Sequence, residues 1–282
     1  MKARRRNDME LIVFDLDGTL LDCESQITPY TSETLRLLSE REIAYTVATG
    51  RTLHGARAIL EGHRFELPQA YKNGVMIWHP DEQRFSSRTV LTAREVENVV
   101  RACVNAGVTP FVFTLDERNE SAIYHPPVRE KIEEKLVRSF ADGKHIPVHP
   151  LDELPAEAPI THVNAIGRPD DIRSVLRSVD DEPNLVAYSG IALEGEAWRW
   201  IDIHHSDASK GGAVRLLKKQ LGIQRVICFG DSENDLSMFE AADEAYAPAN
   251  ASETIRSAAT AVIGRHDEEG IARFLRERFS LG

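Results

Sequence analysis

The sequence of 282 residues has few cysteines, no long apolar run and no excess of basic residues. Its three cysteines, Cys23, Cys103 and Cys228, lack metal-ligand spacing, and its 10 histidines are too dispersed to predict a zinc site. Without a long apolar run, no membrane span is expected. Lys and Arg number 34 and Asp and Glu 45, a net charge of −11, which argues against a nucleic-acid surface. We therefore expect a soluble, cytoplasmic protein whose partner is neither nucleic acid nor membrane.

The composition allows two globular domains. With 42% hydrophobic residues, a chain of this length buries one large core or two moderate ones. The residue pattern changes near residue 84 and changes again near residue 205. We predict one domain from residues 1–83 and 206–282 and a second domain, over 84–205, inserted into it.

The most informative segment follows an apolar run near the N-terminus. Leu11–Phe14 is typical of a strand buried on both faces, and it leads into Asp15, Asp17 and Gly18. In open α/β sheets, ligands bind at the carboxyl ends of strands, which is where Asp15 is predicted to lie. Gly18 lets the backbone turn so that both carboxylates can face one pocket.

Two carboxylates so close together suit phosphoryl transfer. Asp15 can attack phosphorus as a nucleophile while Asp17 donates a proton to the leaving oxygen. Two anions repel an anionic phosphate unless a hard divalent cation such as Mg2+ neutralises them. The pair therefore predicts a magnesium site with more carboxylates and some cationic groups around it.

A second apolar run ends in groups that suit a phosphate. Residues 45–48 have strand character and precede Thr49, Gly50 and Arg51. These three residues offer a hydroxyl, an unobstructed backbone N–H and a guanidinium to phosphate oxygens. We predict a phosphate cradle at this strand end.

Two later segments extend the pattern. Lys210 lies in the first turn of a helix predicted over 210–221, where the helix dipole disfavours a cation by about a few tenths of a kcal/mol. We infer a local anionic partner for Lys210. The apolar run Val226–Phe229 predicts a third buried strand, and the loop after it carries Gly230, Asp231, Asn234 and Asp235.

Each segment has a plainer explanation when it is taken alone. Asp15, Asp17 and Gly18 can form an ordinary turn or part of a calcium loop, although an EF-hand needs further ligands that this stretch lacks. Thr49–Arg51 can be an ordinary connection and Lys210 a solvated side chain. Together, in this order and at strand ends or a helix start, the segments favour one phosphoryl-transfer site.

Four segments resemble, in order and spacing, the motifs of the haloacid dehalogenase-like (HAD) superfamily of phosphatases: Asp15–Thr19, Thr49–Arg51, Lys210 and Gly230–Asp235. The long stretch between the second and third resembles the C2-type cap inserted in the Cof-like branch, which includes sugar phosphatases. The resemblance implies an α/β fold: a Rossmann-like three-layer core with a mainly parallel sheet, plus an inserted α/β cap domain. Further marks of that branch are Asn73–Gly74, Asn250–Ala251 and Glu269–Ile271.

The resemblance also implies roles for the motif residues. Asp15 is the nucleophile that forms an aspartyl-phosphate. Asp17 is the general acid for the leaving group and then the general base for water. The implied phosphate-binding residues are Thr49, Gly50 and Lys210, and the implied substrate contacts are Arg51 and Asn73.

Mg2+ is the cofactor that the resemblance implies. Its ligands are expected to be Asp15, the backbone carbonyl of Asp17, and Asp231. Asn234 and Asp235 are expected either to join them or to support them from behind.

Periodicity predicts alternating helices and strands in both domains. In the first domain we expect strands over 11–14, 45–48, 70–72, 75–78, 226–229, 244–247 and 261–263, and helices over 32–41, 53–60, 210–221 and 269–279. In the inserted domain, Thr92 and Glu95 form a capping box that begins a helix ending at Asn105. The other helices expected there cover 128–140 and 170–179, and the strands cover 111–114, 163–166, 185–189 and 198–204.

Substrate selection is expected in the inserted domain, because a mobile lid excludes water in the first step and admits it in the second. Candidate contacts to the leaving group are Arg118, Asn119, Tyr124 and His125. Trp198 and Trp200 share one face of a strand, and either packing or stacking on a sugar explains them.

The leading hypothesis is a Mg2+-dependent phosphoric monoester hydrolase that acts on a small phosphorylated metabolite, a sugar phosphate or similar. One alternative is a phosphomutase-type transferase, which passes the phosphoryl group from the same intermediate to a second hydroxyl. Another is a regulator that binds a metabolite without turnover; the pairing of Asp15 with Asp17 argues against it. The oligomeric state is left open.

Overall fold

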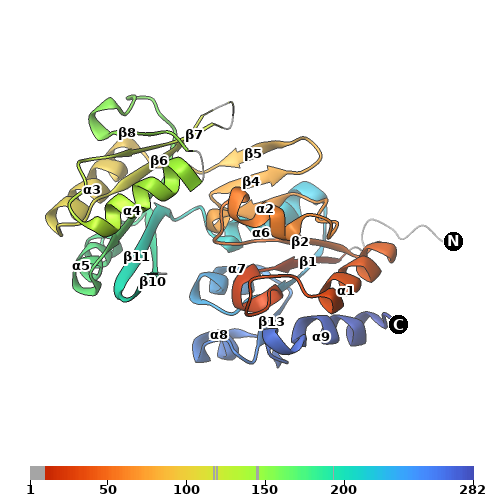
Figure 1. Cartoon of the computed structure of the whole chain (residues 1–282). Helices are drawn as coiled ribbons and strands as arrows, with labels where there is room; N and C mark the ends of the chain where they lie inside the picture. The colour runs from red at the N-terminus through yellow and green to blue at the C-terminus, as the bar shows by residue number, and fades with distance from the viewer. Residues whose placement is uncertain (1–9, 117, 119, 144–145, 193) are drawn as a thin grey trace. The chain divides into compact units, whose positions relative to one another are not determined.

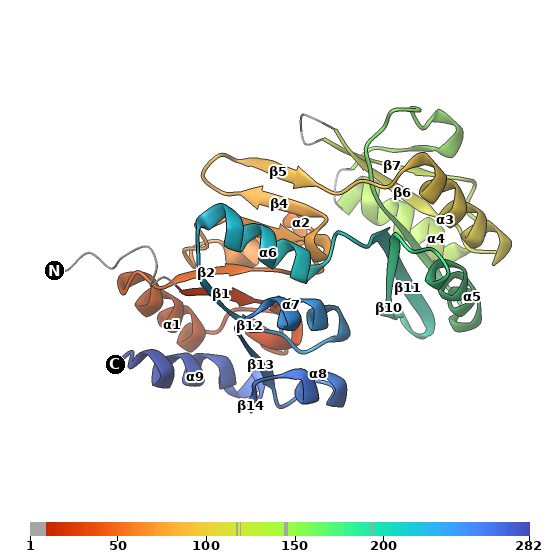
Figure 2. The same ribbon diagram turned by 180° about the vertical axis from the view of Figure 1, so that it is seen from behind.

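The computed structural model describes residues 10–116, 118, 120–143, 146–192 and 194–282. The chain forms two compact units, one of Met1–Ser87 with Ala208–Gly282 and the other of Arg88–Asp207. We call them unit 1 and unit 2 (Figures 1 and 2). The roles predicted for the two domains, catalytic core and specificity cap, stay predictions.

Unit 1 is built on a five-stranded sheet whose pairs are all parallel. The strands in spatial order are β14 (Ala261–Ile263), β13 (Glu244–Pro248), β12 (Arg225–Phe229), β1 (Glu10–Phe14) and β2 (Ala44–Val47). Parallel strands buried on both faces read as continuous apolar runs, which is why the sequence alone located them. The expected α/β fold with a mainly parallel core sheet is confirmed.

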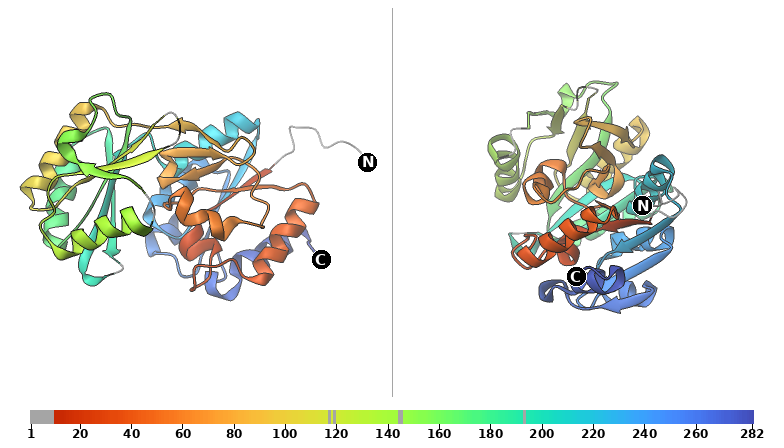
Figure 3. Two further views of the ribbon diagram at one scale, coloured as in Figure 1. Left: turned by 45° about the horizontal axis from the view of Figure 1, so that its top comes forward. Right: turned by 90° about the vertical axis from the view of Figure 1, so that its right-hand side faces the viewer.

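Helices cover both faces of this sheet. On β1, Ile12 and Phe14 pack into the core beside α1 and α9, whereas Leu11 and Val13 point to the core beside α6, α7 and α8. α1 and α9 lie side by side (Figures 1 and 3). The helices of unit 1 are α1 (Pro29–Glu40), α2 (Leu53–Leu60), α6 (Lys210–Leu221), α7 (Leu236–Ala241), α8 (Glu253–Ala258) and α9 (Gly270–Phe279).

A small antiparallel sheet continues from the core. β3 (Gln69–Tyr71) pairs with β4 (Met76–His79), which is followed by β5 (Arg84–Arg88). An isolated parallel bridge between Ala48 and Ala70 joins this sheet to the end of β2. β5 was not predicted, because its Arg-Phe-Ser-Ser-Arg sequence lacks the apolar run of a buried strand.

Unit 2 is a six-stranded sheet with helices. In spatial order its strands are β10 (Leu185–Ala192), β11 (Gly195–His205), β9 (Ile160–Gly167), β6 (Phe111–Leu115), β7 (Ser121–His125) and β8 (Val148–Pro150). Val163 and Ile201 belong to the core that includes residues of α3 (Ala93–Asn105) and α5 (Pro169–Asp180). A separate cluster around Phe111 and Phe140 packs with residues of α4 (Lys131–Arg138).

Local signals explain where the prediction of unit 2 held and where it was wrong. The capping box of Thr92 and Glu95 is present and begins α3. α4 begins later than the predicted 128–140. Glu130 is its N-cap residue, and the Glu133 carboxylate accepts from the backbone N–H groups of Arg129 and Glu130. β8 was not predicted, because its short sequence ends in Pro150; it lies at the edge of the sheet, where proline is tolerated.

Along the described part of the chain, every helix is too short or too polar to cross a lipid bilayer.

We expect Gly211→Ala to destabilise unit 1 by about 2–4 kcal/mol, because overpacking forces the backbone to move. A Cβ at Gly211 would lie 2.0 Å from the carbonyl oxygen of Ser237 in α7. The matched control is Gly222→Ala, at the end of α6, where φ is +67° and the space is open, with an expected cost of about 1 kcal/mol. The measurement is the midpoint of urea unfolding; equal midpoints for the two variants would contradict the packing argument.

Candidate active site

Asp15 lies where β1 ends, at the carboxyl edge of the parallel sheet. Its side chain is buried, and its backbone N–H donates to the carbonyl of Phe229 at 2.9 Å, which ties it to the neighbouring strand β12. The chain then makes an irregular turn over Leu16–Leu20, in which Gly18 has φ +71°. This left-handed conformation favours glycine, as the sequence indicated.

Lys210 is the cationic centre of the site. It begins α6 with its side chain 1% exposed, and its Nζ donates to Asp15 Oδ1 and to Asp235 Oδ1, each at 2.6 Å. The anionic partner inferred from its position in the helix is therefore present, and it consists of two carboxylates. These contacts join the end of β1, the start of α6 and the loop after β12.

Burial and charge shift the pKa values of this group. Burial raises the pKa of Asp15 to about 8, because desolvation outweighs the attraction of Lys210 and Asp235 adds repulsion. Burial opposes the charged form of Lys210, but Asp15 and Asp235 outweigh it and hold its pKa above the ordinary value. With no cation bound, Asp15 therefore keeps its proton at neutral pH, and a cation beside it would favour its ionised form.

Asp235 and Asp231 are two further carboxylates beside Asp15. Asp235 Oδ2 accepts hydrogen bonds from the backbone N–H groups of Asp231 and Ser232, each at 3.0 Å, so both of its oxygens hold the loop in place. Asp231 accepts from the hydroxyls of Thr19 at 3.0 Å and Ser232 at 3.1 Å. Burial, together with the charge of Asp235, raises the pKa of Asp231.

These carboxylates fit a divalent cation. Asp15, Asp231 and Asp235 each place an oxygen within 4.8 Å of the others. The turn after β1 lies directly against Asp231, since a Cβ at Gly18 would be 2.5 Å from Asp231 Oδ2. All the donors are oxygens, which suits a hard ion such as Mg2+.

Asp17 is in a different environment from Asp15. Its side chain is 55% exposed and forms a two-pronged ion pair with Arg51, whose Nε lies 2.7 Å from Oδ2 and whose Nη2 lies 2.5 Å from Oδ1. Arg51 also donates from Nη1 to the carbonyl of Gly55 in α2 at 3.1 Å. Arg51, expected at the substrate, thus lies against the predicted general acid.

The loop after β2 connects to the other motifs. The backbone N–H of Asn73 donates to the Thr49 carbonyl at 2.9 Å, and Asn234 Nδ2 donates to Asn73 Oδ1 at 3.0 Å. A Cβ at Gly50 would be 3.3 Å from Asn73 Oδ1, so the loop packs closely on this amide. Asn234 Oδ1 is buried without a hydrogen-bond partner, and it is therefore an acceptor available at the site.

Asn250 supports the turn after β1, a contact that sequence reasoning missed. Its Nδ2 donates to the Gly18 carbonyl at 2.8 Å, and its Oδ1 accepts from the backbone N–H of His266 at 3.1 Å. Only the family resemblance singled out Asn250. The spacing between Asn250 and the other motifs does not predict its contact with Gly18.

The residues of unit 2 that were predicted as candidate substrate contacts lie in different environments. Tyr124 stacks on His149 with ring centroids 5.2 Å apart, and His125 lines a pocket of about 900 Å3. Arg118 is exposed, and Asn119 lies outside the described residues. Trp200 is 36% exposed, and Trp198 lies under the guanidinium of Arg168 at 4.1 Å, so core packing explains neither tryptophan fully.

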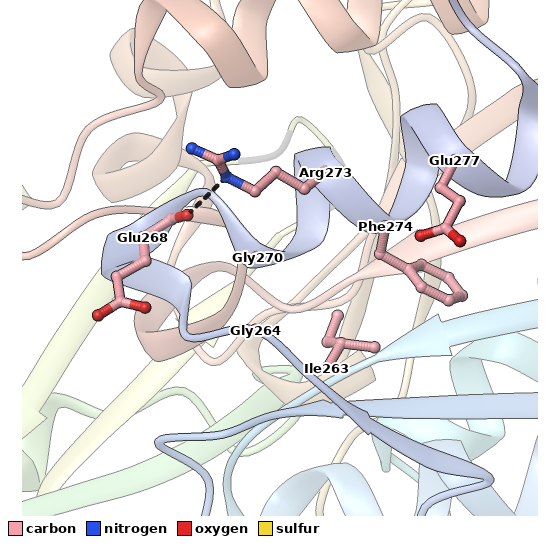
Figure 4. A pocket seen from close by; sticks show the side chains of 7 residues that line it. All are labelled: Ile263, Gly264, Glu268, Gly270, Arg273, Phe274 and Glu277. Atoms are coloured by element: carbon pink, nitrogen blue, oxygen red, sulfur yellow. Dashed lines mark hydrogen bonds between the residues drawn. The ribbon is translucent and has the colours of Figure 1, made fainter.

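A pocket of about 450 Å3 lies beside α9 and shares no residue with the predicted site (Figure 4). Its wall mixes Glu268, Arg273 and Glu277 with Phe274, and Arg273 Nε donates to the Glu268 carbonyl at 3.2 Å. The pocket has no counterpart of the carboxylate and lysine group, so we do not assign it to catalysis.

The sequence model of the haloacid dehalogenase-like hydrolases matches residues 12–275, and the chain therefore belongs to this family. The expected family and the expected enzyme class, a HAD-like phosphatase, are confirmed.

Similar proteins align with nearly the whole chain. This chain is 28% identical over 288 residues to the phosphatase YwpJ of Bacillus subtilis, and the alignment covers 95% of this chain and 99% of that protein. It is 27% identical over 278 residues to the 5-amino-6-(5-phospho-D-ribitylamino)uracil phosphatase YitU of the same species, covering 96% and 98%. A solved haloacid dehalogenase-like hydrolase from B. subtilis has a TM-score of 0.75 at 24% identity, covering 95% and 99%.

The raised pKa of Asp15 makes stability depend on pH when divalent ions are removed. Because the folded-state pKa is about 8 and the ordinary value is 3.8, the folded protein holds a proton that the unfolded chain releases. The contribution of protonated Asp15 to the free energy of unfolding is complete below about pH 4 and is lost as the pH rises to about 8. We expect Asp15→Asn in EDTA to reduce this loss, with the raised pKa of Asp231 accounting for what remains, and at pH 9 to be more stable than the native protein by about 1–3 kcal/mol.

The measurement is the unfolding midpoint as a function of pH in EDTA. Asp170→Asn is the control, because its side chain is 88% exposed. A native protein whose stability is flat between pH 4 and pH 8 would contradict the assigned environment of Asp15.

Proposed function

We propose that this protein is a Mg2+-dependent phosphatase that hydrolyses a small phosphorylated metabolite, a sugar phosphate or similar, through an aspartyl-phosphate. The observation that carries the proposal is the buried contact of Asp15 with Lys210 at the end of β1. A carboxylate held by an ammonium at a ligand-binding sheet edge is a positioned nucleophile. The similarity to a phosphatase named for a phosphoribityl substrate supports a small phosphorylated metabolite.

The first step uses both aspartates. Lys210 holds Asp15 Oδ1, so we assign Oδ2 as the atom that attacks phosphorus. The bond from Oδ2 to phosphorus forms as the bond from phosphorus to the leaving oxygen breaks, and Asp17 gives its proton to that oxygen. Lys210 and the Thr49–Gly50 loop are proposed to stabilise the charge on the phosphoryl oxygens.

The second step returns the site to its starting state. Asp17, now ionised, takes a proton from water, whose oxygen attacks phosphorus. The bond between phosphorus and Asp15 Oδ2 breaks, releasing inorganic phosphate. The two-pronged ion pair with Arg51 holds the Asp17 carboxylate in one orientation. We therefore propose Arg51 as a positioning residue for Asp17 in place of a substrate contact.

Mg2+ is proposed to be held by Asp15, the backbone carbonyl of Asp17, and Asp231, with Asp235 and Asn234 supporting it. When bound, the ion would neutralise the negative charge of the carboxylates and the phosphate.

Substrate selection by unit 2 and a cytoplasmic location are also parts of this proposal. The three cysteines, which are all free thiols, support a reducing location.

The test is release of inorganic phosphate from sugar phosphates, nucleotides and p-nitrophenyl phosphate, with Mg2+ or with EDTA. We expect release with Mg2+ alone and a loss of at least about 1,000-fold in kcat for Asp15→Asn, because no other group can form the covalent intermediate. Asp170→Asn is the control and should retain full activity.

Three outcomes separate the alternatives. Equal amounts of phosphate and dephosphorylated product support a hydrolase. Conversion of a sugar phosphate to its isomer without phosphate release would support the phosphomutase-type transferase. Binding of a metabolite with no turnover, unchanged in Asp15→Asn, would support the regulator.

Arg51 has its own prediction. If Arg51 positions Asp17, Arg51→Ala should lower kcat about 10–100-fold for a sugar phosphate, whose leaving oxygen needs a proton. The same variant should change kcat for p-nitrophenyl phosphate far less, because p-nitrophenolate leaves without a general acid. Arg57→Ala, on the exposed side of α2, is the matched control. An equal rise in KM for both substrates would instead make Arg51 a substrate contact.

A further inference from the structure

A second group of metal-ligating side chains lies in unit 1 and shares no residue with the proposed catalytic site. Cys23, His266 and Asp267 each place a donor atom within 4.8 Å of the other two. Cys23 follows the turn after β1 in sequence, whereas the other two residues lie between β14 and α9. Sequence spacing alone could not reveal this group, because Cys23 is 244 positions from Asp267.

The imidazole of His266 is held by a hydrogen bond to the backbone. Its Nδ1 lies 2.7 Å from the carbonyl oxygen of Leu21. A carbonyl oxygen only accepts hydrogen bonds, so Nδ1 carries the proton and Nε2 keeps its lone pair. A hydrogen bond from one ring nitrogen to a backbone carbonyl is the usual way in which a protein fixes a ligating histidine.

Both segments that carry the donors are held in place. Beside Cys23, the carboxylate of Asp22 accepts from the backbone N–H groups of Glu24 and Gln26, each at 2.9 Å. Around His266, the two ends of residues 264–270 pack closely against each other, since a Cβ at Gly270 would lie 2.0 Å from the carbonyl oxygen of Gly264. Little ordering is then left to be done when a ligand binds.

Asp267 is backed by Arg265. The guanidinium donates from Nε to Oδ1 at 2.9 Å and from Nη2 to Oδ2 at 3.1 Å. These two bonds fix the orientation of the Asp267 carboxylate. Carboxylate oxygens accept more than one partner, and ligating carboxylates are commonly hydrogen-bonded from behind.

We propose that Cys23, His266 and Asp267 form a second metal site, for a borderline divalent cation such as Zn2+. Sulfur and imidazole nitrogen favour such an ion over Mg2+, and three protein ligands leave one tetrahedral position for water or another small ligand. Binding converts the Cys23 thiol to a thiolate, and the displaced proton passes to solvent.

The site is connected to the turn after β1. The His266 backbone N–H donates to Asn250, whose amide holds the Gly18 carbonyl, and the His266 ring holds the Leu21 carbonyl. A metal at Cys23, His266 and Asp267 therefore restrains the middle and the C-terminal end of Leu16–Leu20, the segment that carries Asp17. Its occupancy should raise the Tm of the protein.

The test is a titration of the metal-free full chain with Co2+ in excess Mg2+, which keeps Co2+ from the acidic site. Co2+ is the probe because its bond to a thiolate gives a charge-transfer band in the near ultraviolet. We expect one equivalent to produce this band and one proton to be released. Competition with a chromophoric chelator then gives the Zn2+ affinity.

Variants assign the ligands. Cys23→Ser should abolish the band, and His266→Ala should weaken Zn2+ binding about 10–100-fold, whereas His54→Ala, an exposed histidine of α2, should change neither. Cys23 is exposed, so its variant should fold and keep the Mg2+-dependent activity. No band in the native protein, a band that persists in Cys23→Ser, or equal Zn2+ affinity in His266→Ala would each overturn the proposal.

Discussion

The ammonium of Lys210, buried between Asp15 and Asp235, is the interaction on which the site depends. Taking an ammonium out of water costs several kcal/mol unless carboxylates compensate it, and here two carboxylates do so. They come from the end of β1 and from the loop after β12, so the charge balance is satisfied only when the sheet and α6 have come together. Burial and repulsion from neighbouring carboxylates raise the pKa of Asp15, and this opposition to its ionised form is the physical reason to expect a divalent cation beside it.

The two aspartates of the first motif have different environments, which separates their chemistry. Asp15 is buried against a cation, which suits a fixed nucleophile. Asp17 is half exposed and paired with Arg51, which suits a group that must exchange a proton with a leaving oxygen and then with water. Two residues only two positions apart are thus given different environments by the turn that contains Gly18.

Much of the core could be predicted because parallel buried strands leave a strong signal. The apolar runs before Asp15 and Asp231 marked two central strands and their carboxyl ends. Edge elements were harder: β5 is polar and β8 ends in Pro150, and both depend on neighbours that local sequence does not reveal. Individual contacts were harder still, since the pairing of Arg51 with Asp17 depends on how two loops meet.

The sequence by itself determined the family, the order of the motifs and the kinds of groups that the site contains, because these depend on residue type and local periodicity. Only the tertiary structure decided that Lys210 has two carboxylate partners, that Arg51 lies against Asp17, and that Cys23 meets His266. The physical reason is that ion pairs and metal ligands depend on distances of a few ångströms between side chains. Folding sets those distances by packing segments that are far apart in the chain.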